Sequence, residues 1–184
     1  MNAQRVVRIG VIADTHGLFD PSLLDHFAGV TAIVHAGDIG DSAVLRQLRR
    51  IAPVIAVSGN VDDFERSGFP RARVVRRAGV TIAIRHILFE RGRLSEEAGE
   101  WLDRIQPHIC IFGHSHRPAI DRYGDTILFN PGSAGPRRFS LPRGAGMLIV
   151  RDGDLTPQLI RLEDSVGPVP QRSRKPRSKK GGAS

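Results

Sequence analysis

Two histidines separated by a single residue follow an apolar run in the second half of the chain. The run, residues 109–112, leads into Gly113, and His114 and His116 come directly after it. In an extended segment their imidazoles would point to opposite faces, but a turn at the end of a strand lets both converge. Convergent imidazoles indicate a metal site, whereas a histidine pair in a loop is more often simply solvated. The other polar residues of the chain decide between these interpretations.

Three β-branched runs in the first third of the chain also end in polar side chains. These runs and the residues that follow them are 6–13 with Asp14 and His16, 30–36 with Asp38, and 54–57 with Asn60. Such runs are typical of strands that are buried on both faces. In open α/β sheets, reactive groups collect beyond the carboxyl ends of the strands, because helices cover the faces. We therefore expect these side chains to lie together, with His86 added at the end of the run 80–84.

The candidate ligands offer oxygen and nitrogen donors and no thiolate. They are Asp14, His16, Asp38, Asn60, His86, His114 and His116. Mixed donors suit Mn, Fe, Zn, Co or Ni better than Ca or Mg, which prefer all-oxygen sites. Seven ligands are too many for one catalytic ion, and a carboxylate can bridge two ions roughly 3.5 to 4 Å apart. The set predicts a two-metal site for phosphoryl transfer, although the aspartates and the asparagine taken singly would more simply form turns or helix caps.

Helices and further strands must position these ends. Helices are predicted after the capping residues Asp20, Asp41 or Ser42, and Ser95, the last of them ending near Gln106. Residues 74–77 and 80–84 are expected to form a hairpin, and residues 119–122, 126–129, 146–151 and 155–162 a β meander. The chain contains no linker long enough to divide this body, so we predict one α/β domain over residues 1–164.

The net charge of +8 is concentrated near the end of the sequence. Residues 165–184 hold six of the 27 basic residues and no acidic one, so the remaining body is close to neutral. Prolines, glycines and serines in this segment leave too little apolar surface for folding. We expect a disordered basic tail that either improves solubility or makes weak contact with nucleic acid or another polyanion.

The composition also bears on the cellular compartment. The longest apolar runs are far shorter than the roughly 20 residues of a membrane span, so no contact with a membrane is expected. The segment Met1–Arg5 lacks the pattern of a signal peptide, and the single cysteine, Cys110, fits a reducing compartment. We expect a cytoplasmic protein, and the sequence does not predict its oligomeric state.

The ordered set of motifs resembles the calcineurin-like metallophosphoesterase superfamily. The motifs are Asp14-x-His16, Gly37-Asp38, Gly59-Asn60-x-Asp62, the intervening His86 and Gly113-His114-x-His116. The short chain and the Asn-Pro-Gly-Ser sequence at residues 130–133 are more similar to its small bacterial and archaeal phosphodiesterase branch. The resemblance covers about residues 6–162 and implies a four-layer αββα sandwich.

The resemblance also implies a role for each candidate ligand. Asp14, His16 and His116 would hold the first metal ion, Asn60, His86 and His114 the second, and Asp38 would bridge the two. A hydroxide between two cations has a low pKa and would be the nucleophile. The implied activity is hydrolysis of phosphoric esters, with Mn as the first expected ion and Fe, Zn, Co or Ni as alternatives. Asp38, Asn60 and His114 are the residues expected to act in catalysis.

Two positions depart from the pattern of the family. Many larger members have a histidine directly after the motif asparagine, where it is thought to protonate the leaving group, but this chain has Val61. Alkyl phosphomonoesters, whose leaving alkoxide needs a proton, are therefore less suitable substrates than phosphodiesters. Relatives commonly have glycine after the metal histidine, whereas this chain has Ile87, which can reshape the loop that carries His86. Asp62 is expected to have a supporting or structural role.

Arginines that follow the turn at residues 130–133 are candidates to bind the substrate. Arg137, Arg138 and Arg143 come after this turn, and a guanidinium can form two hydrogen bonds to a phosphate group. A solvated basic loop is the alternative. We predict that Arg137 and Arg138 contact a small-molecule or nucleotide-like phosphoester.

Two functions from other classes stay open. A non-catalytic binding scaffold is known in the retromer subunit of similar fold, which has altered metal ligands, whereas all seven positions are intact here. A nucleic-acid-associated nuclease would use the basic tail. The function that we predict is a phosphodiesterase with two metal ions.

Overall fold

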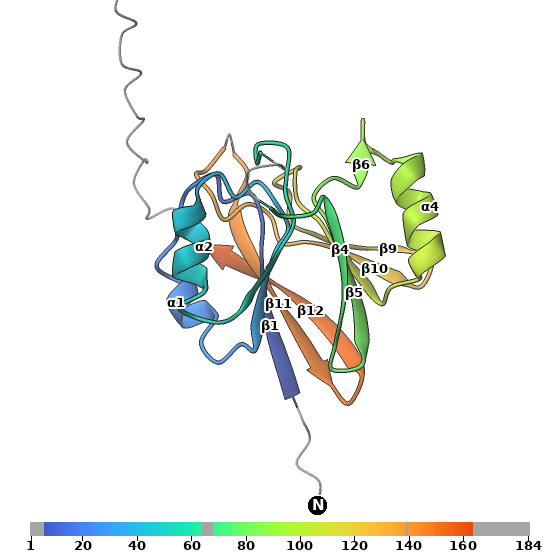
Figure 1. Ribbon diagram of the computed structural model, residues 1–184, viewed down its shortest axis with the longest axis horizontal. Helices are drawn as coiled ribbons and strands as arrows, with labels where there is room; N and C mark the ends of the chain where they lie inside the picture. Colours follow the sequence, from blue (N-terminus) through green and yellow to red (C-terminus); the bar gives the residue numbers. More distant parts are fainter. Residues whose placement is uncertain (1–5, 64–67, 139, 164–184) are drawn as a thin grey trace, which may run out of the picture.

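The computed structural model describes residues 6–63, 68–138 and 140–163, which form two β-sheets packed face to face (Figure 1). The predicted tail at residues 165–184 lies outside the described residues, and so does the predicted domain boundary at residue 164. Within the described ranges, no helix combines the length and the apolar character that crossing a membrane requires.

The first sheet carries three parallel strands from the first third of the chain. In spatial order it contains β12 (Asp154–Leu162), β11 (Arg143–Arg151), β1 (Val6–Ile12), β2 (Ala32–His35) and β3 (Val54–Ala56). Val11 of β1 pairs with Val34 of β2, which pairs with Ile55 of β3, so the carboxyl ends of these strands meet at one edge. β11 runs antiparallel to β1 on its other side.

The second sheet brings the carboxyl ends of three further parallel strands to the same end of the molecule. In spatial order it contains β4 (Ala72–Arg77), β5 (Val80–Arg85), β8 (Ile109–Ile111), β10 (Thr126–Asn130) and β9 (Ala119–Tyr123). Ile84 of β5, Ile111 of β8 and Phe129 of β10 lie side by side in parallel register. β4 and β5 form the predicted antiparallel hairpin.

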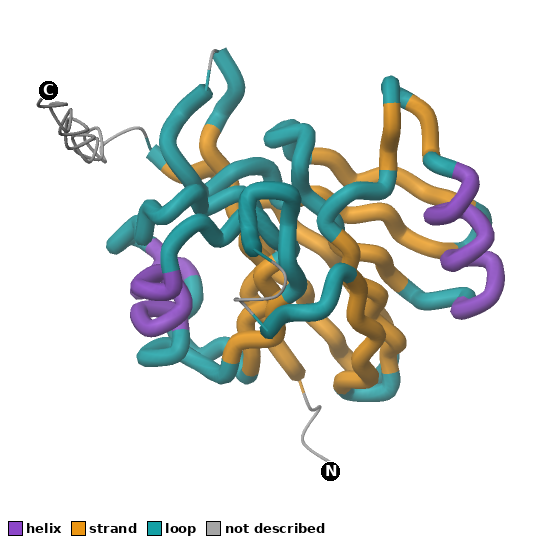
Figure 2. Tube along the Cα trace, turned by 45° about the horizontal axis from the view of Figure 1, so that its top comes forward, coloured by secondary structure: helices purple, strands orange, loops and turns teal. Residues whose placement is uncertain are grey.

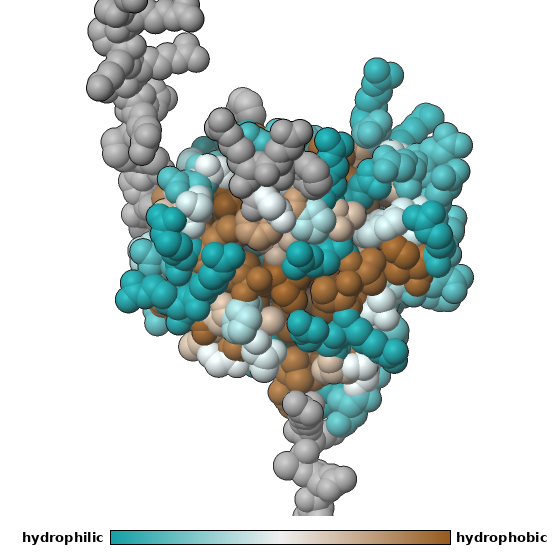
Figure 3. All heavy atoms as spheres, viewed as in Figure 1, coloured by the Kyte–Doolittle hydropathy of each residue, from teal (hydrophilic) through white to brown (hydrophobic). Residues whose placement is uncertain are grey.

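Three layers of buried side chains separate the sheets and helices. The helices are α1 (Leu23–His26), α2 (Ser42–Leu48) and α4 (Glu96–Ile105). Val11 and Val34 pack against Ile84 and Ile111 between the sheets. α1 and α2 cover the outer face of the first sheet, and α4 covers the outer face of the second (Figure 2). On the face shown in Figure 3, hydrophobic residues gather in the middle and hydrophilic residues lie over the helices at both sides. This is the predicted αββα sandwich.

Two of the three predicted helix starts are confirmed. Asp41 caps α2 and Ser95 caps α4, each by accepting a hydrogen bond from a backbone N–H in the first turn. α4 ends at Ile105, and Gln106 takes the left-handed conformation that often closes a helix.

The predicted capping role of Asp20 is wrong. The N-cap of α1 is Ser22, and Asp20 accepts hydrogen bonds from the backbone N–H and the hydroxyl of Ser22. The other oxygen of Asp20 lies 2.7 Å from Arg143 Nη2. The guanidinium of Arg143 is buried and also donates to three backbone carbonyl oxygens, those of Ala134, Gly135 and Glu163. The ion pair and these hydrogen bonds together therefore tie the segment before α1 to the residues just before β11 and just after β12.

The predicted β meander in the second half is also wrong. β9 and β10 form a hairpin in the second sheet, whereas β11 and β12 form a hairpin in the first. Alternating apolar residues and turn signals mark strands but not their partners, because the same local pattern fits either sheet. A short hairpin of β6 (Phe89–Glu90) and β7 (Arg93–Leu94), which the sequence did not predict, stands apart from both sheets near α4 (Figure 1).

Replacing Arg143 should destabilise the fold. Arg143→Met leaves the charge of Asp20 buried without its partner, so we expect a loss of about 3–5 kcal/mol in urea unfolding. The double variant Asp20→Asn/Arg143→Met should regain part of this loss, because it removes the unpaired charge. Arg161→Met on the exposed face of β12 is the matched control and should change stability by less than about 0.5 kcal/mol. Equal unfolding midpoints for the two single arginine variants would contradict a structural role for Arg143.

Candidate metal centre

All seven predicted ligands lie together beyond the carboxyl ends of the parallel strands. Asp14 and His16 follow β1, Asp38 follows β2, Asn60 follows β3, His86 follows β5, and His114 and His116 follow β8. Both sheets contribute, so the site exists only where their edges meet.

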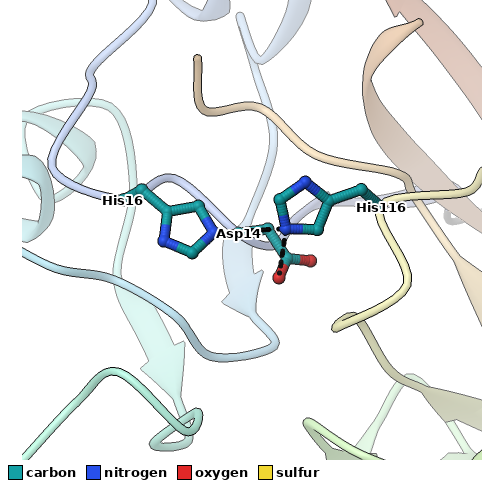
Figure 4. Close-up of side chains that lie close together, drawn as sticks. All are labelled: Asp14, His16 and His116. Atoms are coloured by element: carbon teal, nitrogen blue, oxygen red, sulfur yellow. Dashed lines mark hydrogen bonds and ion pairs between the residues drawn. The ribbon is translucent and has the colours of Figure 1, made fainter. Parts of the chain in front are cut away.

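Asp14, His16 and His116 form one group of donors (Figure 4). Their ligand atoms all lie within 4.8 Å of one another. His116 Nε2 is 3.3 Å from Asp14 Oδ1 and 3.2 Å from His16 Nε2. Donor atoms from two sheets therefore point at a common position, which is the arrangement that a divalent cation such as Zn²⁺ or Mn²⁺ stabilises.

Asp14, Asp38 and His86 form a second group, whose ligand atoms also lie within 4.8 Å of one another. His86 Nε2 is 3.3 Å from Asp38 Oδ1 and 3.2 Å from Asn60 Oδ1. His114 Nδ1 is 3.0 Å from the same Asn60 oxygen. Asn60, His86 and His114 therefore meet on one side of Asp38.

Asp38 belongs to the second group and also faces the first, because each of its oxygens lies near a histidine of a different group. Its Oδ2 is 3.8 Å from His16 Nε2 in the first group, and its Oδ1 is 3.3 Å from His86 Nε2 in the second. The backbone N–H of Val61 donates to Oδ1 at 3.0 Å, and the side chain is buried. The two oxygens of Asp38 therefore face histidines of different groups.

The electrostatics of the site keep the carboxylate charged. Burial alone would raise the pKa of Asp38, but its hydrogen bond and ion pair with His86 and a backbone N–H lower that pKa to about 2. Burial opposes the charged form of His86 as well, but Asp38 and Asp14 raise its pKa. Burial and then the positive charge of Arg138 lower the pKa of His16, which favours the neutral imidazole that binds metals.

The backbone of most candidate ligands is strained. Five of the seven have positive φ: Asp14 (53°), His16 (46°), Asp38 (55°), His114 (68°) and His116 (57°). Residues other than glycine rarely adopt this conformation, which costs on the order of 1 kcal/mol or more for each residue. Such strain gathers at functional sites, where the surrounding fold holds it.

Two glycines in the motifs allow the loops to approach closely. A Cβ at Gly59 would overlap Asp38 Oδ1, and a Cβ at Gly113 would lie 2.6 Å from Asp14 Oδ2. A side chain at either position would therefore displace a candidate ligand.

Asp62 has the supporting role that the sequence indicated. Its two oxygens accept hydrogen bonds from the backbone N–H groups of Ile39, Gly40 and Gly59, at 2.8 to 3.1 Å. These bonds hold the loop after β2, which carries Asp38, against the loop after β3, which carries Asn60.

Two buried supporting residues were missed by sequence analysis. His35 accepts a hydrogen bond from Gly37 N at Nδ1, which assigns the proton of its ring to Nε2, 2.9 Å from Thr15 Oγ1. Thr15 in turn donates to the carbonyl oxygen of Ile39. Complete burial lowers the pKa of His35 to about 4, so this ring stays neutral and holds the loops after β1 and β2 together. The position of His35 inside an otherwise apolar strand was the sequence feature that could have indicated this supporting role.

Asn130 positions the loop that carries His114 and His116. Its Nδ2 donates to Gly113 O at 3.0 Å and to Ser115 Oγ at 3.1 Å. Its Oδ1 accepts from the backbone N–H of Gly132. The turn at residues 130–133 therefore lies behind the site and fixes the loop between His114 and His116.

The three arginines after this turn have different surroundings. Arg138 is exposed, and its positive charge helps to lower the pKa of His16 in the first group. Arg137 is also exposed. Arg143 is buried, and its guanidinium is paired with Asp20 and donates to the carbonyl oxygen of Gly135.

Ile87 does not displace His86. The Nδ1 of His86 lies 2.7 Å from the carbonyl oxygen of Ala36, which orients Nε2 towards Asp38. Ile87 instead lines a cavity of about 410 Å³, together with Asn60, His86 and Arg85.

Comparisons with known proteins identify the family. Residues 7–153 match the calcineurin-like phosphoesterase superfamily domain. A probable metallophosphoesterase of Methanocaldococcus jannaschii is 32% identical over 170 residues, which cover 85% of this chain and 82% of the relative.

Solved structures agree with this match. A protein of Streptococcus pneumoniae described as a predicted phosphoesterase is 25% identical, with a TM-score of 0.67 over 86% of this chain and 91% of that one. Vps29 of Entamoeba histolytica, solved in complex with Zn²⁺, is 20% identical with a TM-score of 0.64, over 84% of this chain and 99% of that one. The second likeness shows the fold alone. Because the domain match spans most of the chain and the archaeal relative is 32% identical, this chain belongs to the calcineurin-like phosphoesterase superfamily, whose chemistry is metal-dependent hydrolysis of phosphoesters.

Proposed function

We propose that the chain is a phosphodiesterase that works with two divalent metal ions, with Mn²⁺ as the first candidate. The observation that carries this proposal is the position of Asp38, whose two oxygens face His16 and His86 in different donor groups. Asp14, His16 and His116 would hold one ion, and Asn60, His86 and His114 the other. Asp14 also lies close to the second group, so its charge would act on both ions.

Two ions in these positions would supply positive charge to the phosphate and a hydroxide nucleophile at neutral pH. The protein's own contribution is positioning. Asn60 adds a neutral oxygen donor where two carboxylates already supply negative charge. His114 is exposed at the mouth of the site, where its imidazole can hydrogen-bond to a substrate oxygen. Arg138, exposed beside His16, is the arginine best placed to contact the phosphate, and Arg137 is proposed to assist it.

The residue after Asn60 supports a diester as the substrate. Val61 is 49% exposed and has no group that can protonate a leaving oxygen, while its backbone N–H is used by Asp38. A diester with a good leaving group needs no such proton, whereas an alkyl monoester does.

A binding scaffold is the weaker candidate. The likeness to Vps29 concerns the fold, and a fold can serve unrelated functions. Seven convergent donors, five of them with a strained backbone, favour catalysis, because a scaffold that works through its surface has no need for them.

Replacing Asp38 tests the two-metal proposal. We expect the purified wild-type protein to bind two Mn²⁺ ions and to hydrolyse bis-p-nitrophenyl phosphate faster when Mn²⁺ is added. Asp38→Asn should bind fewer ions and lose at least about 100-fold in kcat/KM, because ligands of both ions are weakened. Asp25→Asn, on the exposed face of α1, is the matched control. Wild-type activity in Asp38→Asn, or no activating metal in the wild type, would rule the proposal out.

Restoring a proton donor should change the substrate preference. Val61→His is expected to raise the ratio of monoesterase to diesterase activity, on the order of 100-fold at most, as measured with p-nitrophenyl phosphate and its bis ester. Val74→His adds a histidine at another exposed valine and should leave the ratio unchanged. An unchanged ratio in Val61→His would show that a missing proton donor does not set the preference.

The basic segment at residues 165–184 is proposed to make only weak contact with polyanions. A variant that ends at Asp164 should hydrolyse bis-p-nitrophenyl phosphate at the rate of the full chain and should lose salt-dependent binding to single-stranded DNA. If the shortened variant loses hydrolysis together with DNA binding, the result would instead favour a nuclease that depends on its tail.

A further inference from the structure

A second pocket opens beside the proposed metal centre, on the side of the second sheet that α4 covers. It has a volume of about 240 Å³ and lies between the β6–β7 hairpin and the loop after β8. Its walls include Leu88, Phe89, Phe112 and Ala119. Leu88 and Phe112 belong to the buried cluster beneath α4, so the floor of the pocket is part of the core.

The walls of this pocket are apolar and aromatic. The ring centroids of Phe89 and Phe112 are 5.5 Å apart, with the planes tilted by 47°. Leu88 and Phe112 are almost completely buried, and Phe89 is half-buried at the wall. At the hairpin turn, a Cβ on Gly92 would meet no atom within 4 Å, so the turn leaves the neighbouring space open. An apolar pocket with few polar groups is typical of a ligand site.

The pocket adjoins the candidate metal centre at His114. Gly113 and His114 line it, and His114 Nδ1 is 3.0 Å from Asn60 Oδ1. A phosphoester that binds beside His114 therefore has one substituent next to the mouth of the pocket. The volume is below the roughly 300–1,000 Å³ of sites for drug-sized ligands, so it fits one ring system rather than a whole substrate.

Two charged residues complete the rim. Arg117 and Asp121 both line the pocket, and Arg117 is exposed. A guanidinium can stack on the face of an aromatic ring, and a carboxylate can accept a hydrogen bond from a ring N–H. Ala119 and Asp121 face the pocket from alternate positions of β9, so Ile120 between them points the other way.

We propose that this pocket binds the aromatic group of one ester arm of the substrate, and that it thereby selects phosphodiesters with an aryl or nucleobase substituent. The inference rests on the proposed function, because it names the substrate class of that site. The shared chemistry is a planar ring held between Phe89, Phe112 and the rim.

Calorimetry with two phosphonates tests the pocket without any turnover. The Mn²⁺-loaded full chain is titrated with phenylphosphonate and with methylphosphonate, which differ only in the ring. We expect phenylphosphonate to bind about tenfold more tightly. Equal affinities, or binding of neither phosphonate, would overturn the proposal. Ring-selective binding by a protein that does not hydrolyse diesters would instead contradict the proposed function and leave the pocket in place.

Substitutions in the pocket walls test whether the ring of phenylphosphonate binds in this pocket. Ala119→Leu fills the pocket and Phe89→Ala removes a wall, so each should bring the ratio of the two affinities towards one. Ile120→Leu, the neighbouring residue on the opposite face of β9, should keep the tenfold ratio, and unfolding midpoints will check that all three variants fold. A ratio that stays tenfold in both wall variants would place the ring elsewhere.

The source of the ring is resolved by a second pair of ligands. Adenosine 5′-monophosphate and ribose 5-phosphate differ only in the base. Tighter binding of the nucleotide that is lost in Ala119→Leu assigns the pocket to a nucleobase, whereas equal binding of the two, with phenylphosphonate still preferred, assigns it to a simple aryl ester.

Discussion

Two buried carboxylates that face the same histidine are the constraint on which the rest of the structure depends. Asp14 is 0% exposed and Asp38 is 3% exposed, and one oxygen of each lies within 4 Å of His86 Nε2. Like charges in a poorly solvated site destabilise each other unless positive charge compensates them. The imidazoles around them can supply part of that charge, and divalent cations, which this family binds, can supply more. The same cluster that would hold the metals therefore depends on them electrostatically.

The cluster is held by backbone as much as by side chains. Most of the candidate ligands sit at positive φ, and Gly59 and Gly113 let backbone come within contact distance of the two carboxylates. Asp62 and Asn130 tie the loops together by accepting from, or donating to, backbone groups. Because both sheets end at this edge, the packed core between them supports the strain and holds the donors in position.

In the proposed function, residues beside the ligands set which ester the site can use. Val61 leaves the leaving group without a proton donor, Arg138 adds positive charge near His16, and the pocket walled by Phe89 and Phe112 adds apolar surface next to His114. None of these features belongs to the fold as such, which Vps29 shares. In this proposal, residues at the strand ends bind the metal ions, while the loops and the β6–β7 hairpin determine which ester binds.

The sequence by itself determined the parallel strands of the first sheet and the capped helices α2 and α4, and it predicted that the seven candidate ligands lie together, because buried runs, caps and strand-end motifs are local patterns. The predictions that failed concern which residues and strands contact one another. The last four strands divide between two sheets, Asp20 pairs with Arg143 rather than capping α1, and His35 supports the site from inside a strand. Only the tertiary structure decided these points, and with them the place of Asp38 between two donor groups. Such contacts join residues far apart in the chain, and local sequence patterns carry no record of which distant element will pack against them.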